Sequence, residues 1–89
     1  MAVLHFTRAL QRHVDAPSER VDGTTVRAAL DGYFERHPEV RGYVVDERGI
    51  VRRHVAVFVG GEPIADRDAQ SDAVGPDTEI HVMQALSGG

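Results

Sequence analysis

The chain has 89 residues, no cysteine and a formal net charge of −4 at pH 7, and all ten of its positively charged side chains are arginine. A chain of this length makes one domain with a single modest core, and its 42% hydrophobic and 27% charged residues are typical of a globular protein. The acidic balance argues against a nucleic-acid partner, and the absence of thiols excludes disulfides, zinc knuckles and thiol nucleophiles. No apolar run approaches the roughly 18 residues that cross a bilayer, and no signal-peptide pattern is present, so we expect a cytoplasmic protein with no membrane partner.

The first part of the chain predicts two strands and a helix. In the stretch AVLHFTRAL, Leu4 and Phe6 alternate with other positions as in a half-buried strand, and a short second strand fits at 19–21. A threonine at position 24 or 25 can then cap a helix, which Pro38 ends. Apolar residues at i, i+3, i+4, i+7 and i+8 form one face of this helix: Val26, Ala29, Leu30, Tyr33 and Phe34.

The second part predicts strands and turns. YVVDERGIV indicates a small hairpin that turns at 46–49, and HVAVFVGGEPI indicates a strand, a turn at Gly60–Gly61 and a short strand. A polar loop is expected at 65–75, and GPDTEIHVMQ then gives a turn and a final strand. The order of elements predicts an α+β domain with one main helix packed across a mixed or antiparallel sheet.

Three stretches resemble the ubiquitin-like sulfur carriers: DGTTVRAAL, RRHVAVFVGGEPI and GPDTEIHVMQALSGG, of which the final Gly-Gly is the specific part. That family includes the small subunit of molybdopterin synthase, the sulfur carrier of thiazole formation in thiamine synthesis, and the carrier of a thiocarboxylate route to cysteine. The resemblance implies a β-grasp fold, a mixed sheet of four to five strands with one main helix, over residues 1–84, and a flexible tail at 85–89. Residues 52–64 are more similar to the cysteine-route carrier than to the molybdopterin synthase subunit. Gln84, in contrast, stands where many molybdopterin-type and cysteine-type relatives have proline.

The resemblance also implies a chemistry for the tail. In the family, an E1-like adenylating enzyme uses ATP to activate the C-terminal carboxylate, a sulfur source displaces AMP, and a sulfur-accepting biosynthetic enzyme consumes the thiocarboxylate. We therefore expect Gly89 to be the adenylate and thiocarboxylate site, with Gly88 beside it, in a carrier that is not an enzyme and binds no cofactor. Glycine suits this role because it has no Cβ to clash in a narrow channel. With nothing after Gly89, no protease would be needed to expose the carboxylate.

A docking face is expected beside this tail. If Val57 and Val82 point toward the helix, the period-two rule sends their neighbours Phe58, His81 and Met83 to the opposite face. An exposed aromatic ring and a methionine suggest a partner-binding patch, although isolated apolar residues are also normal on surfaces. The expected partner-binding residues are Phe58, His81, Met83, Ala85, Leu86 and Ser87.

Metal binding is not expected from the sequence. His5, His54 and His81 all fall on outward positions, but they have no close-spaced ligand motif and no cysteine accompanies them. The acidic stretch DRDAQSD lacks the glycine and the terminal glutamate of a calcium loop, so a solvated loop is expected there. Arg52–Arg53 are equally expected to be solvated rather than paired with an acidic partner.

Two other functions fit the same residues. A ubiquitin-like protein modifier would be activated in the same way and then joined through Gly89 to lysines of other proteins. A non-catalytic small subunit of molybdopterin synthase, or a regulatory subunit, would bind through its sheet. The accepting pathway, the sulfur source and the oligomeric state stay open at this point.

Overall fold

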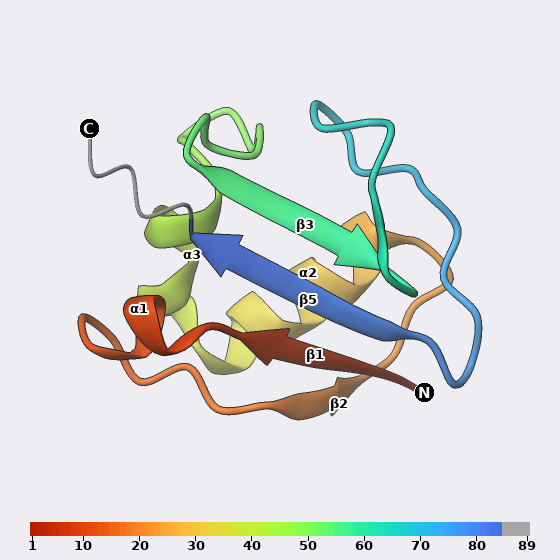
Figure 1. Ribbon diagram of the computed structural model, residues 1–89, viewed down its shortest axis with the longest axis horizontal. Coiled ribbons are helices and arrows are strands. Elements are labelled where there is room, and N and C mark those ends of the chain that lie inside the picture. Colours follow the sequence, from red (N-terminus) through yellow and green to blue (C-terminus); the bar gives the residue numbers. More distant parts are fainter. Residues whose placement is uncertain (85–89) are drawn as a thin grey trace.

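The computed structural model describes residues 1–84, and the tail predicted at 85–89 lies outside the described residues. Five strands form one sheet in the order β2-β1-β5-β3-β4, with β1 parallel to β5 and the other neighbouring pairs antiparallel. The long helix crosses one face of this sheet, and no element of the described residues covers the other face (Figure 1). The strands are β1 (Ala2–Phe6), β2 (Glu19–Val21), β3 (Val55–Val59), β4 (Glu62–Pro63) and β5 (Glu79–Gln84), and the helices are α1 (Arg8–Gln11), α2 (Val26–Arg36) and α3 (Pro38–Val44). The predicted α+β class, the mixed sheet and the number of strands are confirmed.

Alternation along the strands gives the sheet one buried face. Every second residue of β1 is buried, and Leu4 is completely inaccessible to solvent. The central strand β5 follows the same period through Ile80 and Val82, and β3 does so through Val57. Val59, also expected to point inward, is partly buried and packs against the core. The predicted inward set therefore forms the core under the helices.

Helix α2 has the predicted cap and the predicted apolar face. The Thr25 hydroxyl accepts a hydrogen bond from the Ala28 N–H at 3.1 Å, which satisfies one of the free donors of the first turn. The side chains buried on the helix are the five predicted ones, Val26, Ala29, Leu30, Tyr33 and Phe34. The Tyr33 hydroxyl keeps a partner inside the protein by donating to the Pro17 carbonyl at 2.8 Å.

The structure corrects the end of the first strand. The stretch AVLHFTRAL does not stay extended, because β1 ends at Phe6 and the short helix α1 follows at once. Leu10 on α1 is 2% exposed, so this turn of helix closes one end of the core with an apolar side chain. The period-two alternation of Leu4 and Phe6 did not indicate that the chain becomes helical directly after the strand.

The structure has a third helix, α3, where the first strand of a hairpin was expected. Pro38 ends α2 as predicted, but it also starts α3, since proline at the first helical position loses no hydrogen bond. Val40 and Val44 lie four residues apart on α3 and are both buried, so Tyr43 is helical rather than extended. Among residues 1–84, no helix has the length and apolar character required to span a bilayer.

The turn predicted at 46–49 is present without a full hairpin. One carboxylate oxygen of Asp46 accepts hydrogen bonds from the N–H groups of Arg48 and Ile50, at 2.8 and 3.1 Å. These bonds hold the pKa of Asp46 below its ordinary value, the Ile50 N–H being the largest cause. The flanking residues Val45 and Val51 form an isolated bridge rather than two strands.

The remaining turns fall where the sequence predicts them. Gly60 and Gly61 have φ angles of 57° and 89°, and two successive positive values are what a tight two-residue hairpin loop requires. They join β3 to β4, and a turn at Pro76–Asp77 precedes β5.

The loop at 65–75 is more ordered by hydrogen bonds than a solvated loop. The two carboxylate oxygens of Asp72 accept from the N–H groups of Ala65 and Asp66, each at 2.9 Å. Gln70 is 1% exposed, and its side-chain amide donates to the Gly49 carbonyl at 3.2 Å. The buried Gln70 side chain thus connects the loop to the turn at 46–49, which the sequence composition did not predict.

A charged cluster joins β2 to the end of α2. Glu19 accepts from Arg36 at 2.9 Å and from the His37 ring, and both bonds favour its ionised form. The His37 hydrogen bond is the largest cause of a Glu19 pKa below the ordinary value of 4.5. The His37 ring also stacks on Tyr33 at 4.5 Å between centroids.

Candidate functional site

The uncovered face of the sheet carries the side chains that the sequence placed there. Cross-strand pairing puts His5 opposite His81, His81 opposite Phe58, and Phe58 opposite Pro63, so one row of outward side chains crosses four strands. Met83 pairs with Ala56 in the next outward row. Directly opposed residues of neighbouring strands project to the same side, so these two rows form one surface.

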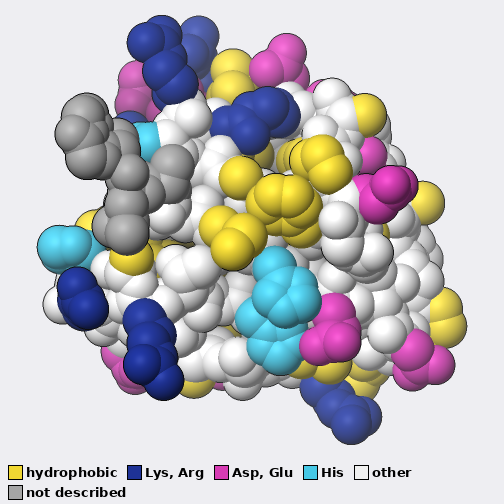
Figure 2. All heavy atoms as spheres, viewed as in Figure 1, with side chains coloured by type: hydrophobic (Ala, Val, Ile, Leu, Met, Phe, Trp, Pro, Cys, Tyr) yellow, Lys and Arg dark blue, Asp and Glu magenta, His cyan; other side chains and the backbone are white. Residues whose placement is uncertain are grey.

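The apolar part of this surface is here called the sheet-face patch, and it consists of Ala56, Phe58, Pro63 and Met83. Met83 is 44% exposed, and the only other exposed large hydrophobic side chains in the described residues are Met1 and Tyr43. Figure 2 shows hydrophobic side chains gathered on this face, with histidines and an acidic side chain directly beside them. The predicted docking residues Phe58, His81 and Met83 therefore lie together.

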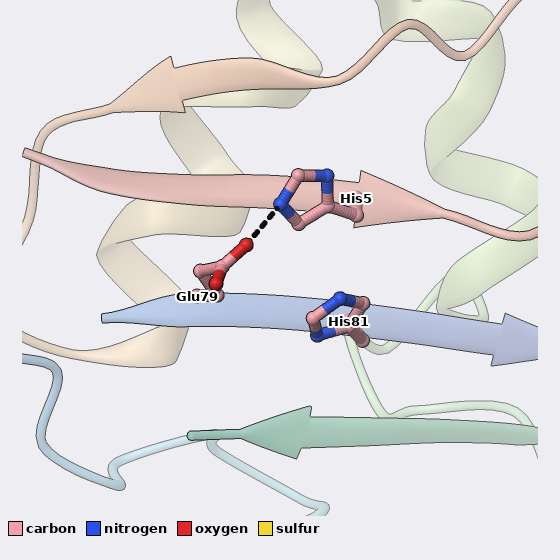
Figure 3. Close-up of side chains that lie close together, drawn as sticks. All are labelled: His5, Glu79 and His81. Carbon is pink, nitrogen blue, oxygen red and sulfur yellow. Dashed lines mark hydrogen bonds and ion pairs between the residues drawn. The ribbon is translucent and has the colours of Figure 1, made fainter. Parts of the chain in front are cut away.

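The second part of the surface is a cluster of His5, Glu79 and His81 on β1 and β5 (Figure 3). The Nε2 atom of His5 lies 2.9 Å from a carboxylate oxygen of Glu79, and its Nδ1 atom lies 2.9 Å from the Ser18 hydroxyl oxygen. The rings of His5 and His81 stack with centroids 4.8 Å apart and planes inclined by 22°. This polar cluster borders the sheet-face patch through the pairing of His81 with Phe58.

The remaining residues that the sequence analysis named are not in these rows. His54 is exposed in the turn before β3, four residues from Phe58 and so about 13 Å along the chain direction of the strand. Ala85, Leu86, Ser87, Gly88 and Gly89, all named as site residues from the sequence, lie outside the described residues. The last described residue, Gln84, ends the central strand opposite Val55.

A basic depression lies at the start of β3, and its lining includes Arg48, Arg52, Arg53, His54 and Arg67. Several of these guanidinium groups already hold the chain together. Arg67 donates to the carbonyls of Arg52 and Val55, each at 2.7 Å, and Arg52 donates to the Gly42 carbonyl at 2.7 Å. The depression is therefore chiefly a structural junction, and the expectation that Arg52 is simply solvated is wrong.

The acidic loop has the same structural character. The Ser71 hydroxyl and the Ala69 N–H both donate to the Asp66 carboxylate, and the Ser71 hydrogen bond is the largest cause of a lowered Asp66 pKa. Backbone N–H groups of Ala65 and Asp66 lower the pKa of Asp72 in the same way. These carboxylates therefore accept hydrogen bonds chiefly from the loop's own backbone.

Sequence reasoning missed one member of the polar cluster, Glu79, and the hydrogen-bond partner of another, Ser18. Glu79 lies two residues before His81 on a strand, so its place on the same face was available from the period of β5. Ser18 gave no such signal, because it precedes β2 in an irregular segment and reaches His5 only through the pairing of β2 with β1.

The fold defines the class of protein. A mixed five-stranded sheet with parallel first and last strands at its centre, and a long helix across one face, is the β-grasp architecture of ubiquitin-like proteins. No protein-family profile and no curated protein sequence matches the chain.

Solved structures show which proteins share this fold over the full length. A chain of the BexX/CysO complex of Amycolatopsis orientalis superposes with a TM-score of 0.83 and 21% identity, covering 100% of both chains. SAMP1 of Haloferax volcanii gives 0.79 at 25% identity, covering 99% of this chain and 98% of that one. CysO of Mycobacterium tuberculosis gives 0.81 at 16% identity, covering 97% and 100%. These neighbours are small ubiquitin-like sulfur carriers and modifiers, the family that the sequence resembles.

Proposed function

We propose that this chain is a sulfur carrier whose Gly89 carboxylate is activated by a separate E1-like enzyme and converted to a thiocarboxylate. The observation that carries the proposal is the match to CysO and SAMP1 over essentially the whole chain, since those neighbours are carriers and modifiers of this kind. The Ser-Gly-Gly sequence at 87–89 adds the chemical group that such a carrier needs.

The proposed reaction takes place at one carbonyl carbon. The Gly89 carboxylate attacks the α-phosphate of ATP, pyrophosphate leaves, and an acyl adenylate forms. Hydrosulfide supplied by a sulfur source then attacks the carbonyl carbon and AMP leaves, which yields the thiocarboxylate. Activation is necessary because a free carboxylate is a poor electrophile, whereas AMP is a good leaving group. ATP belongs to the activating enzyme, and the carrier supplies the reacting carbon.

The folded body is proposed to hold the partner. The sheet-face patch lies on β3, β4 and β5, and Met83 precedes Gln84, the residue at which the described central strand ends. A partner that covers Phe58 and Met83 therefore contacts the carrier directly beside the base of the segment it must receive. Aromatic side chains bring large apolar area with few rotamers to fix, and the flexible methionine side chain adapts to the shape of a partner. In Amycolatopsis orientalis, CysO forms a complex with BexX, which supports partner binding as the mode of action.

The second candidate function is protein modification. SAMP1, a small archaeal modifier protein in Methanosarcina acetivorans, shares this fold, and the Haloferax volcanii SAMP1 is 25% identical to the chain. Activation of Gly89 would be the same, but the adenylate would end as an amide bond to a lysine of another protein. The two functions therefore differ in the product formed at Gly89.

Variants expressed in the native cells test the proposal. Deleting Gly88 and Gly89 should abolish the form of the protein that carries about 16 Da of extra mass on its C-terminal residue, because the carboxylate of the new terminus, Ser87, lies two residues short of the position at which Gly89 reacts. Phe58→Asp together with Met83→Asp should lower the fraction of this form about tenfold, the loss expected when a central apolar contact is removed. Ala28→Asp is the charge control: it adds one negative charge, against two in the double variant, at an exposed position of α2, on the covered side of the sheet. Equal loss in the control, or none in the double variant, would contradict docking through the patch.

A further inference from the structure

Three side chains with metal-ligating atoms converge on the uncovered sheet face. His5 and His81 are directly paired across β1 and β5, and Glu79 lies two residues before His81 on the same side of β5. One nitrogen or carboxylate oxygen from each lies within 4.8 Å of the others. Figure 3 shows the two imidazole rings and the carboxylate on adjacent strands.

We propose that His5, Glu79 and His81 form a binding site for a Zn²⁺ ion. Two imidazole nitrogens and one carboxylate oxygen are the donor set of open, three-ligand zinc sites. With bonds of about 2.0–2.1 Å and tetrahedral angles, the ligand atoms of such a site lie about 3.4 Å apart. The His5 and Glu79 atoms are already 2.9 Å apart, and the greater separations within the cluster contract by rotation of exposed side chains. The Glu79 side chain, 61% exposed, has the freedom to make that adjustment.

Ser18 gives His5 the orientation that metal binding requires. Its hydroxyl oxygen lies 2.9 Å from Nδ1 of His5 and can accept the ring's N–H there. Without metal, the 2.9 Å contact with the Glu79 carboxylate requires a proton on Nε2; once Zn²⁺ takes the place of that proton, the Nδ1–H tautomer leaves the Nε2 lone pair for the metal. Ser18 directly precedes β2, whose Glu19 pairs with Leu4 on β1, so the sheet itself fixes this second partner. Metal-binding histidines characteristically have such a hydrogen-bond acceptor on the other nitrogen.

The backbone makes the arrangement more rigid than a group of surface loops. Two ligands occupy opposed positions of a parallel strand pair at the centre of the sheet, and their rings are nearly parallel. Sites built on strands hold their ligands more precisely than sites built on loops. The cluster lies at the surface, so water completes the fourth position. The site does not involve Gly88 or Gly89 and does not depend on the proposed carrier function, although it shares His81 with the expected docking residues.

The experiment is a Zn²⁺ titration of the full chain without an affinity tag. Binding is measured by calorimetry and, independently, by competition with a chromogenic chelator. We expect one ion per chain. His81→Asn and Glu79→Gln should each weaken binding at least about tenfold, because each removes a ligand. Ser18→Ala should weaken it by about tenfold while leaving all three ligands present. The matched control is His54→Asn, which removes an exposed histidine outside the cluster and should leave affinity unchanged.

Imidazole nitrogen resonances provide a second measurement that needs no variant. Zn²⁺ should shift the signals of His5 and His81 and leave those of His13 and His54 in place. Circular dichroism confirms that each variant is folded, and if His5→Asn is not, the exposed His81 and Glu79 variants still decide the question. The proposal is overturned if no saturable single site appears, if His54→Asn loses as much affinity as His81→Asn, or if the shifts occur at other histidines.

Discussion

Replacing Gly32 by alanine should stabilise the protein. Gly32 lies in the interior of α2, and a Cβ added there would meet no atom within 4 Å outside the neighbouring helix backbone. Alanine therefore brings its helix propensity without a steric cost, a gain of about 0.8–1.0 kcal/mol in the free energy of unfolding. For a domain of this size, that gain raises the Tm by about 4–8 °C.

Gly23 provides the matched comparison, because the same substitution should have the opposite effect there. Its φ angle is +136°, and an added Cβ would lie 2.9 Å from both the Ala28 Cβ and the Ala29 backbone nitrogen. The backbone conformation alone costs an alanine about 1–3 kcal/mol, and relieving the contact also displaces the first turn of α2. We expect a net destabilisation of at least about 2 kcal/mol.

Urea unfolding followed by far-ultraviolet circular dichroism measures both changes, and thermal melting checks the order of the three proteins. The expected order of stability is Gly32→Ala, then the unmodified chain, then Gly23→Ala. A Gly32→Ala protein less stable than the unmodified chain would refute the packing described for α2. A neutral Gly23→Ala would refute the close approach of the 22–24 segment to the helix.

Two further predictions concern a core residue and the loss of stability at acidic pH. Leu30 is 1% exposed between α2 and the sheet, so Leu30→Ala should cost about 2–5 kcal/mol by urea unfolding, and a loss below 1 kcal/mol would contradict its burial. Glu19 has a folded-state pKa below its ordinary 4.5, so its stabilising contribution is present above that value and is lost as the pH falls through the folded pKa. Unfolding curves of Glu19→Gln and the unmodified chain should therefore differ at neutral pH and converge in acid, whereas a constant difference across the range would exclude this coupling to His37 and Arg36.

Local periodicity was sufficient to predict most of the fold. The alternation of Leu4 and Phe6, and the spacing from Val26 to Phe34, each express one buried face, and the structure has both. Helix α3 was missed because proline has opposite effects at different helix positions: it interrupts a helix interior but is well accommodated at the first helical position. Pro38 stops α2 by its missing N–H, yet at the first position of the next helix the same property is harmless. Only the burial of Val40 and Val44 in the core resolves that ambiguity.

Local periodicity predicted only part of the candidate site, because the rest depends on contacts between residues far apart in the sequence. Alternation within β3 and β5 placed Phe58, His81 and Met83 on the outer face, and the structure confirms that they share it. The His5–Glu79 contact joins residues 74 positions apart and depends on the register of a parallel strand pair. No local pattern specifies such a register, because it is set by how both strands pack on α2.

The central claim is that the carbonyl carbon of Gly89 is the reacting atom and that the folded body presents it to partners. The most direct measurement is the mass of the intact protein from its native cells, followed by fragmentation of its C-terminal peptide. We expect a population heavier by about 16 Da, with the added mass on Gly89 alone. Unmodified mass throughout under conditions of active sulfur metabolism, or Gly89 found exclusively in amide bonds to lysines of other proteins, would contradict the carrier function.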